Sequence, residues 1–151
     1  MKAVIQRCLS ASVIADGSSA GSIQKGLLVL LGVAENDTIA EAELLANKIS
    51  LLRIFCDEND RMNLSVGDVK GSILAVSNFT LCADSKKGNR PSFINAMEQN
   101  KANELYEKFC QKIESNNIPV VKGVFGADMQ VSMVGVGPVT IVLDTDIWSK
   151  K

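Results

Sequence analysis

Three short polar stretches interrupt an otherwise apolar sequence and have the composition to carry chemistry. The first is SNFTL at 77–81, where Ser77, Asn78 and Thr80 follow a β-branched run that should be buried. Such side chains often bond to nearby backbone where a strand leaves the core. They also suit the floor of an active site, in which backbone N–H groups and a hydroxyl face a substrate. The residue types alone leave both interpretations open.

The second stretch, KKGNRPSF at 86–93, gathers the cations Lys86, Lys87 and Arg90 around a Gly-Asn pair. One interpretation is a solvated surface loop. The other is a loop that contacts phosphates, since Lys and Arg on a flexible segment readily meet a backbone anion.

The third stretch, GPVT at 137–140, separates two strand-like runs at 129–135 and 139–144. Proline has no N–H for a sheet ladder, so it is expected at an edge, a strand start or a bulge. Only about 5–6% of X–Pro bonds in folded proteins are cis, so sequence alone favours a trans bond. Gly137 permits a positive φ and the close approach of another group.

The chain contains no histidine, which excludes a Ser-His-Asp catalytic triad, a Cys-His catalytic dyad and a histidine-rich zinc site. A general base would have to be a carboxylate, a lysine, a water or a group on the substrate. No metal is expected, because the cysteines form no CxxC pair. We expect four free, buried thiols, with a nucleophilic Cys82 as the alternative; they are Cys8, Cys56, Cys82 and Cys110.

Composition predicts one domain over 1–151 and gives no sign of a polyanionic or membrane partner. The net charge is −1, apolar residues make up 46% and charged residues 22%. The longest apolar run, 26–34, is far shorter than the ~20 residues of a membrane span. The beginning, MKAVIQR, has no signal-peptide core. We therefore expect a cytoplasmic protein with no DNA or membrane partner.

Hydrophobic periodicity predicts an α+β domain with mixed or antiparallel β-rich sheets and two main helices. Thr38 and Glu41 fit a capping box at the start of the first helix. The expected helices are 38–52 and 100–115, and the expected strands are 2–9, 11–15, 26–33, 53–56, 71–81, 120–124, 129–135 and 139–144, with turns at 16–21 and 57–60 and a loop at 82–93.

Together the three stretches resemble the D-aminoacyl-tRNA deacylases, the D-tyrosyl-tRNA deacylase family. SNFTL is similar to that family's Ser-Gln-Phe-Thr-Leu motif, and GVGPVT to its Asn-x-Gly-Pro-Val-Thr motif. Asn78 replaces the usual glutamine, and Gly135 replaces the usual asparagine. Further matches follow in order along the chain: QR at 6–7, GLLVLLGV at 26–33, RIF at 53–55, MNLS at 62–65, RPSF at 90–93 and ADMQVS at 127–132.

The resemblance implies hydrolysis of the ester that joins a D-amino acid to tRNA, by a barrel-like homodimer with its active sites at the interface and no cofactor. It implies a cis Gly137–Pro138 pair that enters the partner's pocket and rejects L-aminoacyl groups. The residues so assigned are Ser77, Asn78, Phe79 and Thr80 for catalysis, Gly137 and Pro138 for rejection of the L form, and Arg7, Lys86, Lys87 and Arg90 for tRNA binding.

This chemistry is compatible with the absence of histidine. An aminoacyl ester is already activated, and N–H donors on the developing oxyanion can supply much of the acceleration. The backbone N–H groups of Phe79 and Thr80 are the candidate donors. Rejection by steric overlap spares glycine, so glycyl-tRNA should be a substrate too. The alternatives are a non-catalytic dimeric RNA- or ligand-binding module and a thiol hydrolase that uses Cys82.

Overall fold

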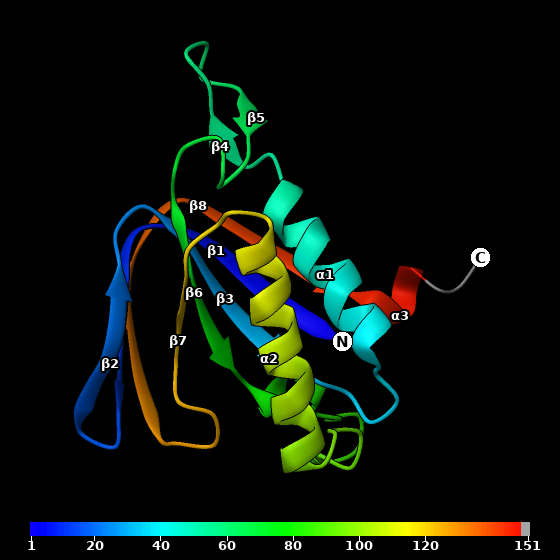
Figure 1. Ribbon diagram of the computed structural model, residues 1–151. Helices are drawn as coiled ribbons and strands as arrows, with labels where there is room; N and C mark the ends of the chain where they lie inside the picture. Colours follow the sequence, from blue (N-terminus) through cyan, green and yellow to red (C-terminus); the bar gives the residue numbers. More distant parts are fainter. Residues whose placement is uncertain (149–151) are drawn as a thin grey trace.

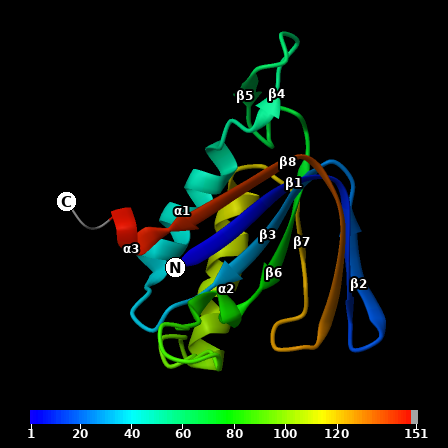
Figure 2. The ribbon, with the colours of Figure 1, turned by 180° about the vertical axis from the view of Figure 1, so that it is seen from behind.

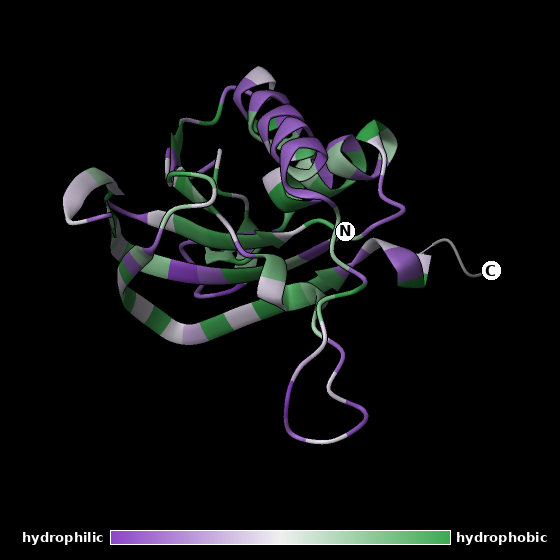
Figure 3. Cartoon of the chain, turned by 90° about the horizontal axis from the view of Figure 1, so that it is seen from below, coloured by the Kyte–Doolittle hydropathy of each residue, from purple (hydrophilic) through white to green (hydrophobic). Residues whose placement is uncertain are grey.

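A curled six-stranded mixed sheet carries two long helices on one face (Figures 1 and 3). The computed structural model describes residues 1–148. The strand order is β2-β1-β3-β6-β7, with β8 paired to the other edge of β1, and the sheet is nearly closed like a barrel. The sheet strands are β1 (Lys2–Ala15), β2 (Ser18–Ile23), β3 (Gly26–Gly32), β6 (Ser72–Ser77), β7 (Val120–Lys122) and β8 (Met129–Asp144).

The helices and the minor elements complete the expected α+β class. A small antiparallel ribbon extends beyond the end of α1 (Figure 1). The elements are α1 (Ile39–Leu51), α2 (Gln99–Ser115), α3 (Thr145–Trp148), the short 3₁₀ helix η1 (Phe79–Cys82), and the ribbon strands β4 (Phe55–Cys56) and β5 (Met62–Leu64). No helix within residues 1–148 has the length and apolar character needed to cross a membrane.

The capping box predicted at Thr38 is present. The Thr38 hydroxyl accepts from the backbone N–H of Ala40, and Glu41 accepts from the backbone N–H of Thr38 at 2.7 Å. The hydrogen bond from the Thr38 side chain holds the pKa of Glu41 below its usual range. This arrangement satisfies free N–H groups at the start of α1.

The main core lies between the helices and the sheet. Alternate residues of β1 and the nearly continuous apolar run of β3 supply the sheet side, as the two-faced burial of 26–33 predicted. From α2, the buried Tyr106 hydroxyl donates to the carbonyl of Ala75 on β6 at 2.8 Å. Burial raises the pKa of Tyr106, so the phenol stays protonated. A second buried cluster, which includes Leu28, Leu74 and Val76, packs on the opposite face.

The first hairpin differs from the prediction in its boundaries. Residues 2–15 form one continuous strand, and the turn occupies only Asp16 and Gly17, both with positive φ. The polar residues after Gly17 pair with the end of β1 instead of forming a turn. Ser and Gly in this stretch suggested a loop. They lie instead on an edge strand, where backbone pairing with β1 holds the chain extended.

The break predicted at Gly137–Pro138 is a bulge inside one strand, not a gap between two strands. β8 pairs with β1 along nearly its whole length (Figure 2). The pairing steps from Gln6↔Thr140 to Cys8↔Gly135, so the intervening segment of β8 is longer than that of β1. Among the described residues, β8 pairs with β1 alone. No strand on the other side of Pro138 therefore needs an N–H from the proline.

The Gly137–Pro138 peptide is cis, and Gly137 has a φ of +115°. The expectation of a trans bond, which rested on the general frequency of X–Pro bonds, is therefore wrong. The cis form that the family resemblance implied is the one present.

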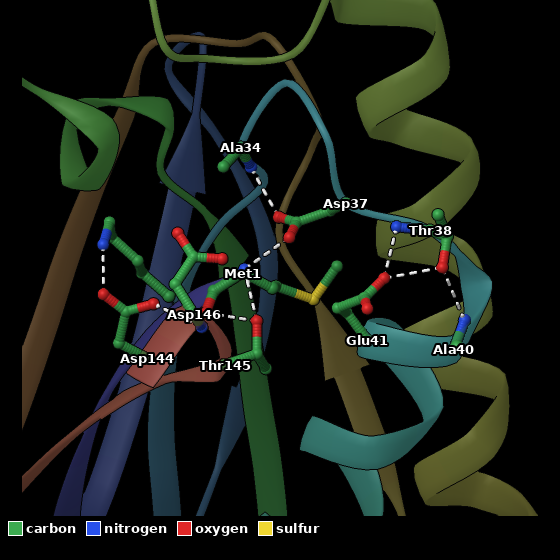
Figure 4. A network of polar contacts seen from close by, with 10 residues as sticks. Met1, Ala34, Asp37, Thr38, Ala40, Glu41, Asp144, Thr145 and Asp146 are labelled. Carbon is green, nitrogen blue, oxygen red and sulfur yellow. Dashed lines mark hydrogen bonds and ion pairs between the residues drawn. The ribbon is translucent and has the colours of Figure 1, made fainter. Parts of the chain in front are cut away.

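A buried polar network closes the barrel at the start of β1 (Figure 4). The Met1 ammonium is fully buried and contacts Asp37 Oδ1 at 2.6 Å and Thr145 Oγ1 at 2.7 Å. The other oxygen of Asp37 accepts from the Ala34 N–H at 2.6 Å. One carboxylate thus holds the first strand and the loop before α1 together.

Replacing Asp37 with alanine should lower the free energy of unfolding by about 3 kcal/mol or more. The change leaves a buried ammonium without its counter-charge, which is strongly destabilising. Urea unfolding of a chain that begins at Met1 measures the effect. Glu35→Ala, an exposed carboxylate two residues away, is the matched control and should stay within about 0.5 kcal/mol of the parent. A loss below 1 kcal/mol for Asp37→Ala would contradict this role.

Candidate active site

An apolar cleft of about 780 Å³ opens beside the end of β6. Its walls come from the sheet, from the start of α2 and from the segment that enters β8. The few polar groups in it include Ser77 and Asn78. A mostly apolar cleft with a few polar groups is the usual form of a small-molecule site. Its lining residues are Gln6, Leu28, Leu30, Leu31, Val33, Val76, Ser77, Asn78, Phe79, Ala96, Met97, Gln99, Ala102, Phe125, Gly126, Ala127, Met129, Val131 and Met133.

The chain leaves the sheet at Asn78 and turns directly into η1. Ser77 is the last β6 residue paired with β3, opposite Leu31, and the Asn78 N–H still donates to the Leu31 carbonyl at 2.8 Å. Gly32 makes this turn possible, because a Cβ there would lie only 2.8 Å from Leu81 Cβ and 3.1 Å from the Asn78 carbonyl. The end of the buried strand β6 thus places Ser77 and Asn78 in the wall of the cleft.

The first N–H groups of η1 are free to act as donors. Asn78 occupies the cap position but does not cap the backbone; its side-chain oxygen accepts from Thr80 Oγ1 instead. Among residues 1–148, no acceptor binds the N–H of Phe79 or Thr80. Phe79 borders the cleft, and two adjacent unpaired donors of this kind can stabilise an oxyanion where they face the reacting carbonyl.

The nucleophile alternatives fit the structure poorly. The Thr80 hydroxyl contacts an amide, which does not act as a base. Cys82 is 3% exposed, and burial raises the pKa of its thiol, which disfavours the thiolate. Three of the four free cysteines are buried as expected, but Cys56 is exposed because β4 belongs to the outlying ribbon.

Gly137 and Pro138 line a separate pocket of about 300 Å³, which shares Gln6 and Met133 with the cleft. Arg7 also borders this pocket, and its guanidinium donates to the Ile54 carbonyl at 2.8 Å. A Cβ on Gly137 would lie 3.1 Å from Arg7 Nη2 and 2.9 Å from the Val139 side chain. Only glycine therefore suits this position.

Within one chain, the strand register separates Gly137–Pro138 from the stretch that begins at Ser77. The bulge lies opposite Arg7, which pairs with Leu27 of β3, and Leu27 pairs with Ile73 of β6. Ser77 is three strand spacings and four residues away, about 14 Å across and 13 Å along the sheet. The two predicted elements are therefore not brought together by a single chain.

The predicted tRNA-binding residues fall in two places. Lys86, Lys87 and Arg90 lie in an exposed loop that stands away from the sheet and helices (Figure 3). Two hydrogen bonds of 2.8 Å between the backbones of Asp84 and Ser92 close the base of this loop. Arg7 does not lie in that loop; it is half-buried beside Gly137. Its role in tRNA binding stays a prediction, and its contacts favour support of the bulge.

Sequence reasoning gave no role to several residues that line the cleft. Gln6 borders both pockets, and its side chain lies 3.4 Å from Thr140 Oγ1. Gln99 and Phe125 also line the cleft. The QR match at 6–7 was the only signal for Gln6, and nothing in the sequence marked Gln99 or Phe125, which reach the cleft only through the tertiary fold.

Comparison with known proteins identifies the family. The family model for D-Tyr-tRNA(Tyr) deacylase matches residues 4–144. A solved structure described as "c-Myc DNA Unwinding Element Binding Protein" is 41% identical, covering 95% of this chain and 98% of that chain, with a TM-score of 0.90. A probable eukaryotic D-amino acid tRNA deacylase, 16% identical over 94% of this chain and 97% of that chain, shares the fold with a TM-score of 0.78.

The family and the fold class expected from the sequence are thereby confirmed, while the dimer stays a prediction. Because the family model matches nearly the whole chain, this protein belongs to the D-Tyr-tRNA(Tyr) deacylase family and is a hydrolase of the ester bond in aminoacyl-tRNA.

Proposed function

We propose that the protein frees tRNA from D-amino acids by holding the aminoacyl ester against the start of η1. The observation that carries this proposal is the pair of unpaired N–H groups of Phe79 and Thr80 beside an apolar cleft. Water attacks the ester carbonyl, and the two N–H groups stabilise the oxyanion that forms. The ester C–O bond then breaks, the ribose oxygen takes up the proton that the attacking water has lost, and the free amino acid leaves.

A second copy of the chain completes the site in this proposal. The Gly137–Pro138 pair of one chain lies three strands away from its own Ser77, so in this proposal it serves the Ser77 stretch of a partner. The sheet face beside the bulge supports such a contact. Val142 is 72% exposed there, on the same side of β8 as Thr140 and next to Val4 of β1. An exposed apolar strip of this kind is suited to an interface between identical chains.

Selection against L-aminoacyl groups then follows from shape. D- and L-amino acids differ in the direction in which the side chain leaves Cα. Gly137 and Pro138 present a wall without flexible side chains, backed by Arg7 and Val139. Such a wall blocks an L side chain by overlap and needs no contact with the D side chain. Glycine has no side chain to block and should be hydrolysed as well.

The proposal is tested by comparing D-alanyl-, glycyl- and L-alanyl-tRNA at equal enzyme concentration. We expect D-alanyl- and glycyl-tRNA to be hydrolysed and the L-alanyl ester to react more than about 200-fold more slowly. Attraction to one methyl group yields at most about that ratio. If glycyl-tRNA resists as L-alanyl-tRNA does, the steric account is wrong. Binding of tRNA without hydrolysis of any ester would favour the non-catalytic alternative.

Thr80→Ala should retain hydrolysis of D-alanyl-tRNA within about tenfold of the parent, because the backbone N–H survives and the hydroxyl only contacts Asn78. Loss of an obligatory nucleophile would cost about 10³-fold or more in kcat. Thr80→Ser is the matched control, which keeps the hydroxyl. A covalent acyl adduct on Thr80 in the parent enzyme would contradict the mechanism.

Val142→Glu should produce a monomer in sedimentation velocity and lose D-alanyl-tRNA hydrolysis about 100-fold, because a buried unpaired carboxylate opposes association. Leu51→Glu is the matched control: Leu51 is 73% exposed, on α1, away from the strip. It should leave both the mass and the activity unchanged. A Val142→Glu monomer with full activity would show that one chain suffices.

A further inference from the structure

A second pocket, of about 550 Å³, borders the end of η1, whereas the cleft borders its start. Phe79, the first residue of η1, lines the cleft, and Cys82, the last, lines this polar pocket. Only three steps of about 2.0 Å separate the two residues along the helix, so adjacent nucleotides of one strand can reach both spaces. The lining residues of the polar pocket are Lys2, Ala34, Glu35, Asn36, Asp37, Cys82, Ala83, Asp84, Ser85, Lys86, Asn95 and Asp146.

Two of the charged groups in the polar pocket already have partners within the chain. Both oxygens of Asp37 accept hydrogen bonds, one from the Met1 ammonium and one from the Ala34 N–H (Figure 4). The Lys2 ammonium pairs with the carboxylate of Asp144. These groups hold the wall of the pocket together, so a ligand would be bound by other side chains.

Several exposed side chains of the polar pocket are still available to a ligand. Among residues 1–148, the side-chain amides of Asn36 and Asn95 and the carboxylate of Glu35 have no hydrogen-bond partner. Asp84 uses one carboxylate oxygen to accept from the Lys86 N–H at 2.9 Å, which leaves the other oxygen free. The pocket thus offers amide donors and carboxylate acceptors next to each other.

We infer that this pocket binds the penultimate base of the tRNA, which is the second cytosine of the CCA end. The inference rests on the proposed function, in which the ester on the terminal ribose lies in the cleft. The preceding nucleotide then reaches the polar pocket across η1. Lys86 supports this path, because it lines the pocket and also belongs to the basic loop.

The chemistry of the lining favours a cytosine base over a phosphate. More carboxylates than cations line the pocket, so a phosphate group is repelled from its interior. Cytosine carries an amine that donates to a carboxylate, and its ring acceptors can take N–H groups from the asparagine amides. Uracil has a carbonyl oxygen in place of that amine, and the same carboxylates repel it. The phosphate next to the base stays outside the pocket, where it faces Lys86.

The experiment measures the binding of two 5′-labelled trinucleotides, CCA and CUA, by fluorescence anisotropy. We expect the parent protein to bind CCA about 5- to 150-fold more tightly, which is the usual discrimination by paired hydrogen bonds to one base. Asn95→Ala, and the double variant that adds Asn36→Ala, should lose most of this preference. Asn59→Ala, an exposed asparagine of the outlying ribbon, is the matched control and should retain it. Lys86→Gln should weaken both trinucleotides equally, because a phosphate contact does not read the base.

Equal affinity of the parent protein for CCA and CUA would overturn the inference, and intact hydrolysis of D-alanyl-tRNA would then spare the proposed function. A preference for CCA that survives in both asparagine variants would place the base elsewhere and would also overturn it. So would a preference that EDTA abolishes, because the pocket would then hold a divalent cation. A preference for CCA that the asparagine variants lose, without hydrolysis of any ester by the parent, would support the pocket and contradict the proposed function.

Discussion

The pairing of β1 with β8 is the constraint on which the rest of the molecule depends. β1 bonds to β8 along one edge and to β2 and β3 along the other, so it positions both halves of the sheet. The Met1 ammonium, held by Asp37 and Thr145, fixes one end of this pairing. Because β8 pairs only with β1 in the described chain, it tolerates a bulge that a central strand would not.

This pairing places two features at different positions on one sheet: the free N–H groups that follow β6, and the Gly137–Pro138 pair of β8. β6 is parallel to β3 and ends at Ser77, where the chain turns into η1 and exposes free N–H groups. β8 carries Gly137 and Pro138 on the opposite side of β1 and β3. The proposed reaction centre and the proposed selective wall thus lie on the same sheet but at different places. A rigid sheet can meet both demands at one substrate when two copies face each other, which is why we place the complete site in a dimer.

The sequence predicted well those elements whose structure depends on residues within the element itself. The box of Thr38 and Glu41 placed the start of α1, and the apolar run from 26 predicted a strand buried on both faces. Features that depend on a neighbouring strand were predicted poorly. Ser18–Gly21 have turn composition but pair with β1, and β8 continues through Gly137–Pro138 because β1 holds it on both sides of the bulge. The exposure of Cys56 follows from the outlying ribbon, which composition does not reveal.

The two departures from the family motifs are changes of side chain in segments where backbone groups have the proposed roles. Asn78 still donates its N–H to Leu31, and its shorter amide is engaged by Thr80. Gly135 still pairs with Cys8, and a Cβ there would meet Met133 at 3.2 Å, so the glycine leaves that methionine its place between the bulge and the cleft. In the proposed site the donors and the wall are backbone groups, so a change of side chain at these two positions leaves those groups present in the chain. In the proposed mechanism the same backbone groups allow a hydrolase without histidine to act on an ester that is already activated, because positioning and the stabilised oxyanion lower the barrier to attack by water.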